Sequence, residues 1–534
     1  MRRVKSILSV SLATLLLAAT VCSCGGGKDT SSTASGTASN ASGTSSNSST
    51  SSKADSSSNP GSDASANSST DPNSNTGTNS TPNSNPGSNT SSNTTPEPPK
   101  PMERKLYDDK VENMGGYEFV IANPWMNREP PDNAGLAERL IHQRIDEVEK
   151  EYNCKVRITD FYGGMEALMP RIMAGDKVAD VLNMLPEMWI PAAGAGFLRT
   201  WNDVADIVNF YDTRWLEAQT NATLKGKTYI LQYERPADSA ALFLWYNKDV
   251  LKAAGIKEDP AQMALDGTWT WDVFREMLKK INKPTANRYG LHWVDSYSSP
   301  LRALAASNGA MAVTMNSKNE YVATFSDQKY IDALNFLDQI VNVDKTMKIY
   351  PNMKTEEKWN DMPSVETVFN NFEKGLAGFI AGRIWYGGSL KLKEGLNYGM
   401  VVYPKGPAAK DYISCSNTLG GFAMTSTNPD YEKAAKIFRA IARPTKDFED
   451  IDAYENDIVS DFFMDGDEMS KKMMRLGAKN SVLDVGYSVR NLQMGLDRAG
   501  ISAIFWQENT VAASIDAIKG TFDKDIQDTF KKLP

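Results

Sequence analysis

The chain contains very little histidine and cysteine. Of its 534 residues, two are histidine and four are cysteine. After residue 104 there is no His-Glu-x-x-His, Cys-x-x-Cys, Gly-x-Ser-x-Gly or phosphate-loop pattern, so no motif-bearing enzyme class is indicated. The scarcity of histidine argues weakly against acid–base or zinc chemistry, and we expect no cofactor and no metal. The 66 aspartates and glutamates still leave a pair of catalytic carboxylates open.

A basic tract is absent beyond the first five residues. The formal net charge is −8 and the isoelectric point is about 5.2, which argues against nucleic acid as a partner. No second apolar run of about 18 residues follows the N-terminal one, so no further membrane span is predicted. The globular part keeps only Cys154 and Cys415, for which a disulfide and two buried free thiols both stay open.

The N-terminus is typical of a secretory signal. Three basic residues, Arg2, Arg3 and Lys5, precede an apolar run over residues 7–21. The sequence Val-Cys-Ser-Cys-Gly that follows resembles a bacterial lipobox. This resemblance implies that residues 1–23 are a lipoprotein signal peptide and that Cys24 carries a diacylglycerol anchor. Cys22 as the acceptor, or an ordinary signal peptide, remains the alternative.

Residues 24–104 consist almost entirely of Ser, Thr, Asn, Gly, Asp and Pro. Such a segment cannot bury enough apolar surface to offset the entropy of ordering, so we expect a disordered stalk. A flexible linker of about 75 residues has a root-mean-square reach of ~50 Å. The stalk would hold the following domain away from a membrane and through a cell wall.

The remaining chain, of about 430 residues, is too long for one core and predicts two or three lobes. Residues 117–185 alternate between short apolar runs and helical stripes, in the order strand, helix, strand, helix, strand. This order predicts a parallel sheet, whose ligands lie beyond the carboxyl ends of the strands. Trp125 follows one such end, and Glu187 and Trp189 follow another.

Later stretches carry a family resemblance through their order and spacing. They are Leu242-Phe-Leu-Trp-Tyr-Asn-Lys-Asp, Ala253-Ala-Gly-Ile, Thr270-Trp-Asp, Phe372-Glu-Lys-Gly-Leu-Ala-Gly-Phe-Ile-Ala-Gly-Arg-Ile-Trp, Tyr398-Gly-Met-Val-Val-Tyr-Pro, Gly420-Gly-Phe-Ala-Met and Ala503-Ile-Phe-Trp. Over residues 115–534 the chain resembles the extracellular solute-binding proteins of family 1, the maltose-receptor-like sugar receptors of bacterial ABC importers. Leu376 departs from the usual lysine, and residues 350–363 look like an insertion.

The resemblance implies an α/β, two-lobe periplasmic-binding-protein-like fold with a hinge and an interlobe cleft. Lobe 1 would comprise residues 115–243 and 405–453, and lobe 2 residues 249–395 and 454–534. A ligand would bind in the cleft, with hinge closure around it.

A sugar offers an apolar ring face and a rim of hydroxyls, which aromatic plates and carboxylates recognise. Trp269 and Trp271 are expected to pack in the core, because the Thr-Trp-Asp helix start is structural in the family. The candidate ligand contacts, from strand ends and from the family match, are Trp125, Glu187, Trp189, Trp293, Asp295, Trp385 and Trp506.

The sequence therefore predicts a monomeric substrate-binding lipoprotein that captures an oligosaccharide and delivers it to the transmembrane subunits of an ABC permease. It would sit lipid-anchored on the outer face of the cell membrane, which suits a Gram-positive organism without an outer membrane. Two alternatives stay open: a secreted carbohydrate-active enzyme with paired carboxylates, and a wall-associated polysaccharide-binding adhesin.

Overall fold

The computed structural model describes most of the chain after residue 110. The described residues are 111–124, 126–130, 136–160, 164–208, 222–231, 242–293, 298–350, 364–416, 420–442, 463 and 467–533. They all belong to one compact unit of the chain. Cys24, the stalk, and residues 351–363 of the expected insertion lie outside them. No helix among the described residues is long and apolar enough to cross a bilayer.

The first of two large sheets has five strands in the order β2-β1-β3-β14-β4. β1 pairs in parallel with both β2 and β3, whereas β14 runs antiparallel to β3 and β4. The parallel pairing that the alternating sequence predicts is thus confirmed. The strands are β1 (Tyr117–Ala122), β2 (Cys154–Thr159), β3 (Val181–Met184), β4 (Leu198–Arg199) and β14 (Gly421–Thr425).

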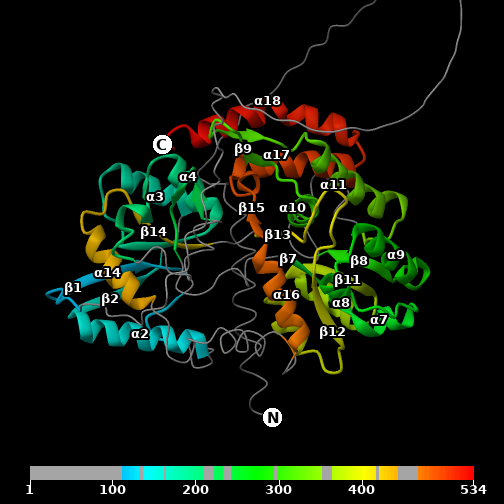
Figure 1. Cartoon of the computed structure of the whole chain (residues 1–534), viewed down its shortest axis with the longest axis horizontal. Helices are drawn as coiled ribbons and strands as arrows, with labels where there is room; N and C mark the ends of the chain where they lie inside the picture. Colours follow the sequence, from blue (N-terminus) through cyan, green and yellow to red (C-terminus); the bar gives the residue numbers. More distant parts are fainter. Residues whose placement is uncertain are drawn as a thin grey trace, which may run out of the picture. The chain divides into compact units, whose positions relative to one another are not determined.

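Four helices accompany this sheet: α2 (Leu136–Tyr152), α3 (Gly164–Met173), α4 (Pro186–Gly194) and α14 (Tyr431–Ile441). Helices α2 and α14 lie side by side (Figure 1). His142, in the middle of α2, is buried. A surface position, which the charged neighbours of His142 in the sequence suggest, is therefore wrong.

The second large sheet has four strands in the order β12-β7-β11-β8. β11 is parallel to β8, and the central strand β7 is antiparallel to β11 and β12. All six residues of β7 are buried, as expected for a strand whose residues are apolar on both faces. The strands are β7 (Leu242–Asn247), β8 (Tyr289–Trp293), β11 (Ala377–Arg383) and β12 (Tyr398–Val402).

Helices and short ribbons surround the second sheet. The helices are α7 (Lys248–Ala253), α8 (Pro260–Leu265), α9 (Trp271–Ile281), α10 (Ser298–Ser307), α11 (Gln328–Asp338), α12 (Val365–Glu373), α13 (Tyr386–Lys391), α16 (Glu468–Lys479), α17 (Arg490–Gly500) and α18 (Val511–Phe530). Two ribbons pair β9 (Val313–Met315) with β10 (Tyr321–Ala323) and β13 (Ser414–Ser416) with β15 (Ser481–Leu483). A third ribbon, β5 (Thr223–Leu224) with β6 (Lys227–Thr228), lies instead beside the segment that follows β4 of the first sheet, where the backbone N–H of Thr228 donates to the Asn202 side chain. α16 runs beside β12 (Figure 1).

The start of α9 follows from local sequence. The Thr270 hydroxyl caps the helix by accepting from the backbone N–H of Val273. Trp269 and Trp271, on either side, are both buried, and the Trp269 indole N–H donates to the carbonyl of Val402 in β12. The packing role expected for these two tryptophans matches their burial.

Strand β13 refines the expected lobe boundaries. Its partner is β15, and it also contacts β7 and α10 around the second sheet. The first sheet receives the chain again only at β14. We therefore propose that the return to lobe 1 falls after residue 416, about ten residues later than the family resemblance implies.

The C-terminal helix α18 connects elements of both sheets. It packs along α17 (Figure 1), and its last turn contacts α4. Just beyond that turn, the Lys225 ammonium in the β5–β6 turn donates to the carbonyl of Leu533 over 3.3 Å.

The two cysteines of the globular part occupy different strands, Cys154 in β2 and Cys415 in β13. Both are buried free thiols. The sequence leaves a disulfide and two buried free thiols open, and the structure has the free thiols.

Candidate functional site

Trp385 presents its indole at the end of a buried strand. It follows β11, whose residues are buried up to Gly382, and stands at the N-cap position of α13. Its exposed fraction is 38%, which places it among the few large apolar side chains that are exposed in the described part of the chain. An exposed indole at a strand's carboxyl end is the kind of surface on which a sugar ring stacks.

Arg383, two residues earlier, lies against this indole. Its guanidinium carbon is 4.9 Å from the centre of the Trp385 ring. The backbone of Arg383 is fixed by its pairing with β7 and by the Trp245 indole, which donates to the Arg383 carbonyl over 3.1 Å. A rigid strand end thus holds a cation and an aromatic plate together.

Glu187 lies in the first turn of α4, after β3 of the first sheet. Its side chain is exposed and, apart from its own backbone amide, makes no hydrogen bond or ion pair to any described residue. Desolvation nevertheless raises the pKa of this carboxyl, because protein surrounds it although water reaches its surface. The positive charges of Arg302 and Arg383 oppose that rise in pKa.

Both arginines come from elements around the second sheet, Arg302 from α10 and Arg383 from β11. Glu187 comes from the first sheet. The charges that act on the Glu187 carboxyl thus come from elements of the other large sheet.

Arg302 is buried, and its charge acts on the buried carboxyls of Asp484 and Asp497. Its guanidinium carbon lies 5.7 Å from the centre of the Tyr487 ring. Burial raises the pKa of Asp484 to about 6 and of Asp497 to about 7, and in both cases the Arg302 charge opposes the rise. Asp484 also accepts backbone N–H bonds from Ala312, Val313 and Gly486 over 2.5, 3.3 and 3.0 Å. These contacts fix the Asp484 carboxyl in place near Arg302.

The other candidate contacts have mixed outcomes. Trp189 and Trp293 are fully buried, so neither offers the exposed ring face that stacking on a ligand requires. Trp506 is half-buried after a π-helical turn over residues 501–505, and its indole nitrogen has no hydrogen-bond partner among the described residues. Trp125 and Asp295 lie outside the described residues.

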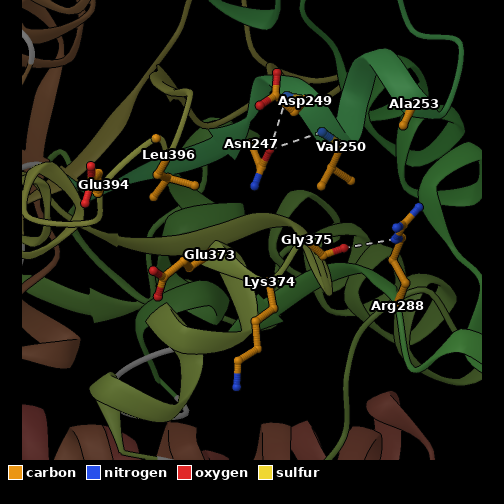
Figure 2. A pocket seen from close by; sticks show the side chains of 11 residues that line it. Asn247, Asp249, Val250, Ala253, Arg288, Glu373, Lys374, Gly375, Glu394 and Leu396 are labelled. Carbon is orange, nitrogen blue, oxygen red and sulfur yellow. Dashed lines mark hydrogen bonds between the residues drawn. The ribbon is translucent and has the colours of Figure 1, made fainter.

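A separate cavity of about 290 Å³ opens at the opposite end of the second sheet from Trp385. Its wall includes the last residue of β7, Asn247, and the residues just before β11 and β12. Figure 2 shows Asn247 accepting from the backbone of Asp249 and Val250, and Arg288 donating to the Gly375 carbonyl. Its charged wall residues are of both signs: Asp249, Arg288, Glu373, Lys374 and Glu394. We assign no ligand to it.

No group of three or more potential metal ligands occurs in the described part of the chain. The two arginines are residues that the sequence reasoning missed. Arg383 lies inside the family-like stretch that ends at Trp385. Its position two residues before this candidate tryptophan could have identified it as a site residue. Arg302 carried no such signal, because nothing in the sequence around α10 indicates that its charge acts on Glu187.

Comparison with known proteins identifies a family and solved structures that resemble this chain. The family model of bacterial extracellular solute-binding proteins matches residues 135–445, more than half of the chain. The curated proteins include no match.

Three similar solved structures are a sugar-binding protein of Xanthomonas citri, an ABC substrate-binding protein of Listeria monocytogenes bound to cycloalternan, and UgpB of Mycobacterium tuberculosis bound to glycerophosphocholine. Their TM-scores are 0.55, 0.51 and 0.52, with 13, 15 and 14% sequence identity. In the same order, the matches cover 77, 78 and 78% of this chain and 97, 99 and 98% of the matched chains.

At this identity the solved structures show the fold, which has two α/β lobes with a ligand cleft between them. The family match adds the protein class. Together they establish that the chain belongs to the bacterial extracellular solute-binding protein family.

Proposed function

We propose that this protein is the extracellular substrate-binding lipoprotein of an ABC importer. It captures an oligosaccharide in the interlobe cleft and delivers it to the permease. The observation that carries the carbohydrate assignment is Trp385, an indole exposed over 38% of its surface at the carboxyl end of β11.

Polar groups suited to a sugar's hydroxyl rim accompany this plate. Glu187, a carboxylate with no side-chain partner among the described residues, is an acceptor for hydroxyl donors. Arg383 is a donor beside the indole itself. Acceptor and donor come from opposite lobes, so a polyhydroxylated ligand between them would contact both and favour closure.

Magnitudes support stacking as the main source of affinity. A buried aromatic removes ~150–250 Å² from water, and at ~25 cal/mol/Å² this is an upper bound of several kcal/mol per plate. Trp385 and Trp506, the two described candidate tryptophans that are not fully buried, would together approach the ~8 kcal/mol of a micromolar ligand, less the costs of ordering. Neutral hydrogen bonds, at about 1 kcal/mol net, contribute more to specificity.

The solved relatives support the class of ligand only in part. The Xanthomonas protein is a sugar-binding protein and the Listeria protein holds a cyclic oligosaccharide. The Mycobacterium protein holds a phosphodiester instead. The ligand panel must therefore include both chemistries.

The binding test is a thermal-shift panel on the full chain with oligosaccharides, glycerophosphodiesters, amino acids, peptides and metal ions. We expect only oligosaccharides to raise the melting temperature. A shift with another class and none with sugars would refute the carbohydrate assignment. Conversion of a bound oligosaccharide to shorter products would favour a secreted enzyme, and retention on insoluble polysaccharide without a soluble ligand would favour an adhesin.

The site test uses Trp385→Ala, which should weaken sugar binding at least tenfold in calorimetry. Leu392→Ala is the matched control, because Leu392 is also exposed and lies just beyond α13. If Trp385→Ala and Leu392→Ala both bind the sugar as tightly as the wild type does, Trp385 is not part of the site.

The membrane anchor is part of the same proposal and rests on the sequence around Cys24 alone. Growth with labelled palmitate should label the wild type and Cys22→Ser, but not Cys24→Ser. Loss of label in Cys22→Ser alone would move the lipid to the other cysteine.

A further inference from the structure

Two π-helical turns around the second sheet lie against each other. The first, Gln339–Val343, continues α11, and the second, Ile501–Phe505, continues α17. Such turns are rare in proteins and frequently occur at functional sites. The residue that follows the second turn is Trp506, one of the candidate ligand contacts.

Trp506 lies at the same edge of the second sheet as Trp385. Its neighbour Phe505 packs edge-on against Trp293, with the ring centres 6.2 Å apart. Trp293 is the last residue of β8, and its partner in the parallel strand β11 is Ala381. Trp385 comes just after β11 ends. Both tryptophans are therefore near the carboxyl ends of neighbouring parallel strands, where ligands bind in α/β sheets.

The indole nitrogen of Trp506 is buried, yet it has no hydrogen-bond partner among the described residues. Packed tryptophans of the same chain differ in this respect. The Trp245 indole donates to the Arg383 carbonyl over 3.1 Å. The Trp269 indole donates to the Val402 carbonyl over 2.9 Å. Trp506 is thus not held by a hydrogen bond of its own indole, so its orientation depends on the backbone that carries it.

Asn342, in the first π-helical turn, holds the second turn. Its side-chain amide donates to the Ile504 carbonyl over 2.8 Å and to the Asp338 carboxylate over 2.6 Å. An asparagine amide has two hydrogens, one for each of these bonds. Asp338 therefore fixes the direction of the Asn342 amide, and the amide fixes the backbone two residues before Trp506.

The first turn is anchored to the strand that supports Phe505. The backbone N–H of Leu291, in β8, donates to the carbonyl of Thr346, just after the turn, over 3.1 Å. The same strand ends at Trp293, on which Phe505 packs. Both turns thus have a common support, and the bond from Asn342 joins them to each other.

The backbone after Trp506 has a conformation that needs such support. Gln507 has a φ of +56°, in the left-handed region that residues other than glycine seldom adopt. The chain then turns back, and the N–H of Glu508 donates to the Ser502 carbonyl over 3.0 Å. Sparsely populated conformations persist only where the surrounding structure holds them. The surroundings of the second turn therefore decide how Trp506 is oriented.

We infer that Asn342 is a positioning residue of the sugar site, which holds Trp506 at the ligand-binding edge through the Ile504 carbonyl. This inference rests on the proposed function and deepens it. An indole that is already held in place binds a sugar ring more tightly than a mobile one, because less conformational freedom is lost on binding. Asn342 acts only through Trp506.

The test measures affinity by calorimetry on the full chain, with an oligosaccharide that raises the melting temperature of the wild type. Asn342→Ala should weaken binding about fivefold, the equivalent of one hydrogen bond. Asn342→Gln keeps both amide donors and should recover most of the affinity. Asn282→Ala is the matched control, because it also removes an amide bond to a carbonyl, that of Lys345 at 3.1 Å, but does not connect the two π-helical turns. Its affinity should equal that of the wild type.

A double-mutant cycle separates positioning from a general loss of stability. Once Trp506→Ala has removed the indole, Asn342→Ala should change the affinity by less than about twofold. An equal loss of affinity in the wild-type and Trp506→Ala backgrounds would refute the inference. Circular dichroism checks that each variant is folded, and Asn342→Leu, which is close to asparagine in size, is the second variant without amide donors.

Failure of this inference can be told apart from failure of the proposed function. If the wild type binds the oligosaccharide and neither Asn342→Ala nor Asn342→Leu weakens binding, Asn342 is not a positioning residue, and the carbohydrate assignment stands. If Trp506→Ala leaves the affinity unchanged, the inference is again refuted and the assignment stands. If no oligosaccharide binds the wild type while a ligand of another class does, both are refuted.

Discussion

Gly194, in the last turn of α4, lies directly against the backbone carbonyl of Thr529 in α18. A Cβ atom at Gly194 would collide with that carbonyl oxygen, which belongs to the backbone and cannot rotate away. The helix that carries Glu187 at its start is therefore held at its end by the C-terminal helix.

Gly194→Ala should destabilise the protein, although alanine is the better helix former. Overpacking against backbone costs about 1–3 kcal/mol, which should lower the melting temperature by several degrees. Gly520→Ala is the matched control on α18, because nothing lies within 4 Å of its added Cβ. That variant should gain up to about 1 kcal/mol. Equal effects of the two substitutions on the melting temperature would contradict the close contact.

Asn247 caps α7 and also tethers α12. Its side-chain oxygen accepts from the backbone of Asp249 and Val250 (Figure 2). Its amide donates to the Phe372 carbonyl over 2.9 Å. Asn247→Ala should cost about 2 kcal/mol in urea unfolding, since it removes a cap and strands a buried carbonyl. Thr510→Ala removes only the exposed cap of α18 and should cost about 1 kcal/mol or less. If Asn247→Ala lowers the free energy of unfolding no more than Thr510→Ala does, the hydrogen bond to the Phe372 carbonyl does not contribute to stability.

The buried carboxyl of Asp497 predicts a pH-dependent stability. Its folded-state pKa is raised to about 7, above the ordinary value of about 4. The folded state thus holds a proton that the unfolded state has lost, and the stabilisation it provides is lost as the pH rises between these values. Relative to the wild type, Asp497→Asn should become more stable as the pH rises from 5 to 8. A difference in unfolding free energy that stays constant over this range would contradict the raised pKa.

Cys154 and Cys415 should resist thiol reagents in the folded protein. Both are buried, and desolvation raises their pKa, to about 11 for Cys154 and about 12 for Cys415, so little reactive thiolate forms near neutral pH. Peptide mapping after iodoacetamide treatment should find both unmodified without denaturant and both modified in urea. A reducing agent should leave the melting temperature unchanged. A disulfide-linked peptide in the map would overturn the unpaired assignment.

Much of the fold was predictable because it depends on local patterns. The alternation of apolar strands and amphipathic helices over residues 117–185 predicts parallel pairing, since strands joined by a helix run in the same direction. Thr270 at a helix start and the apolar Leu242–Asn247 strand are likewise properties of their own segments.

The site was predictable only in part. Trp385 and Glu187 both follow strands, and both are exposed. Trp189 and Trp293 also lie at or just past strand ends, yet they are fully buried. Sequence position says that a side chain is near the sheet's edge, but whether it points to solvent or to the core depends on which helices pack around it.

By itself, the sequence determined the family and the alternating α/β pattern, because each depends on contiguous residues; the signal peptide and the stalk stay predictions from the sequence. Only the tertiary structure decided that the charges of Arg302 and Arg383 act on the Glu187 carboxyl, and that Arg383 lies over Trp385. Glu187 and Arg383 are almost 200 positions apart, and electrostatic interaction depends on distance in space, which only the packing of the two lobes sets.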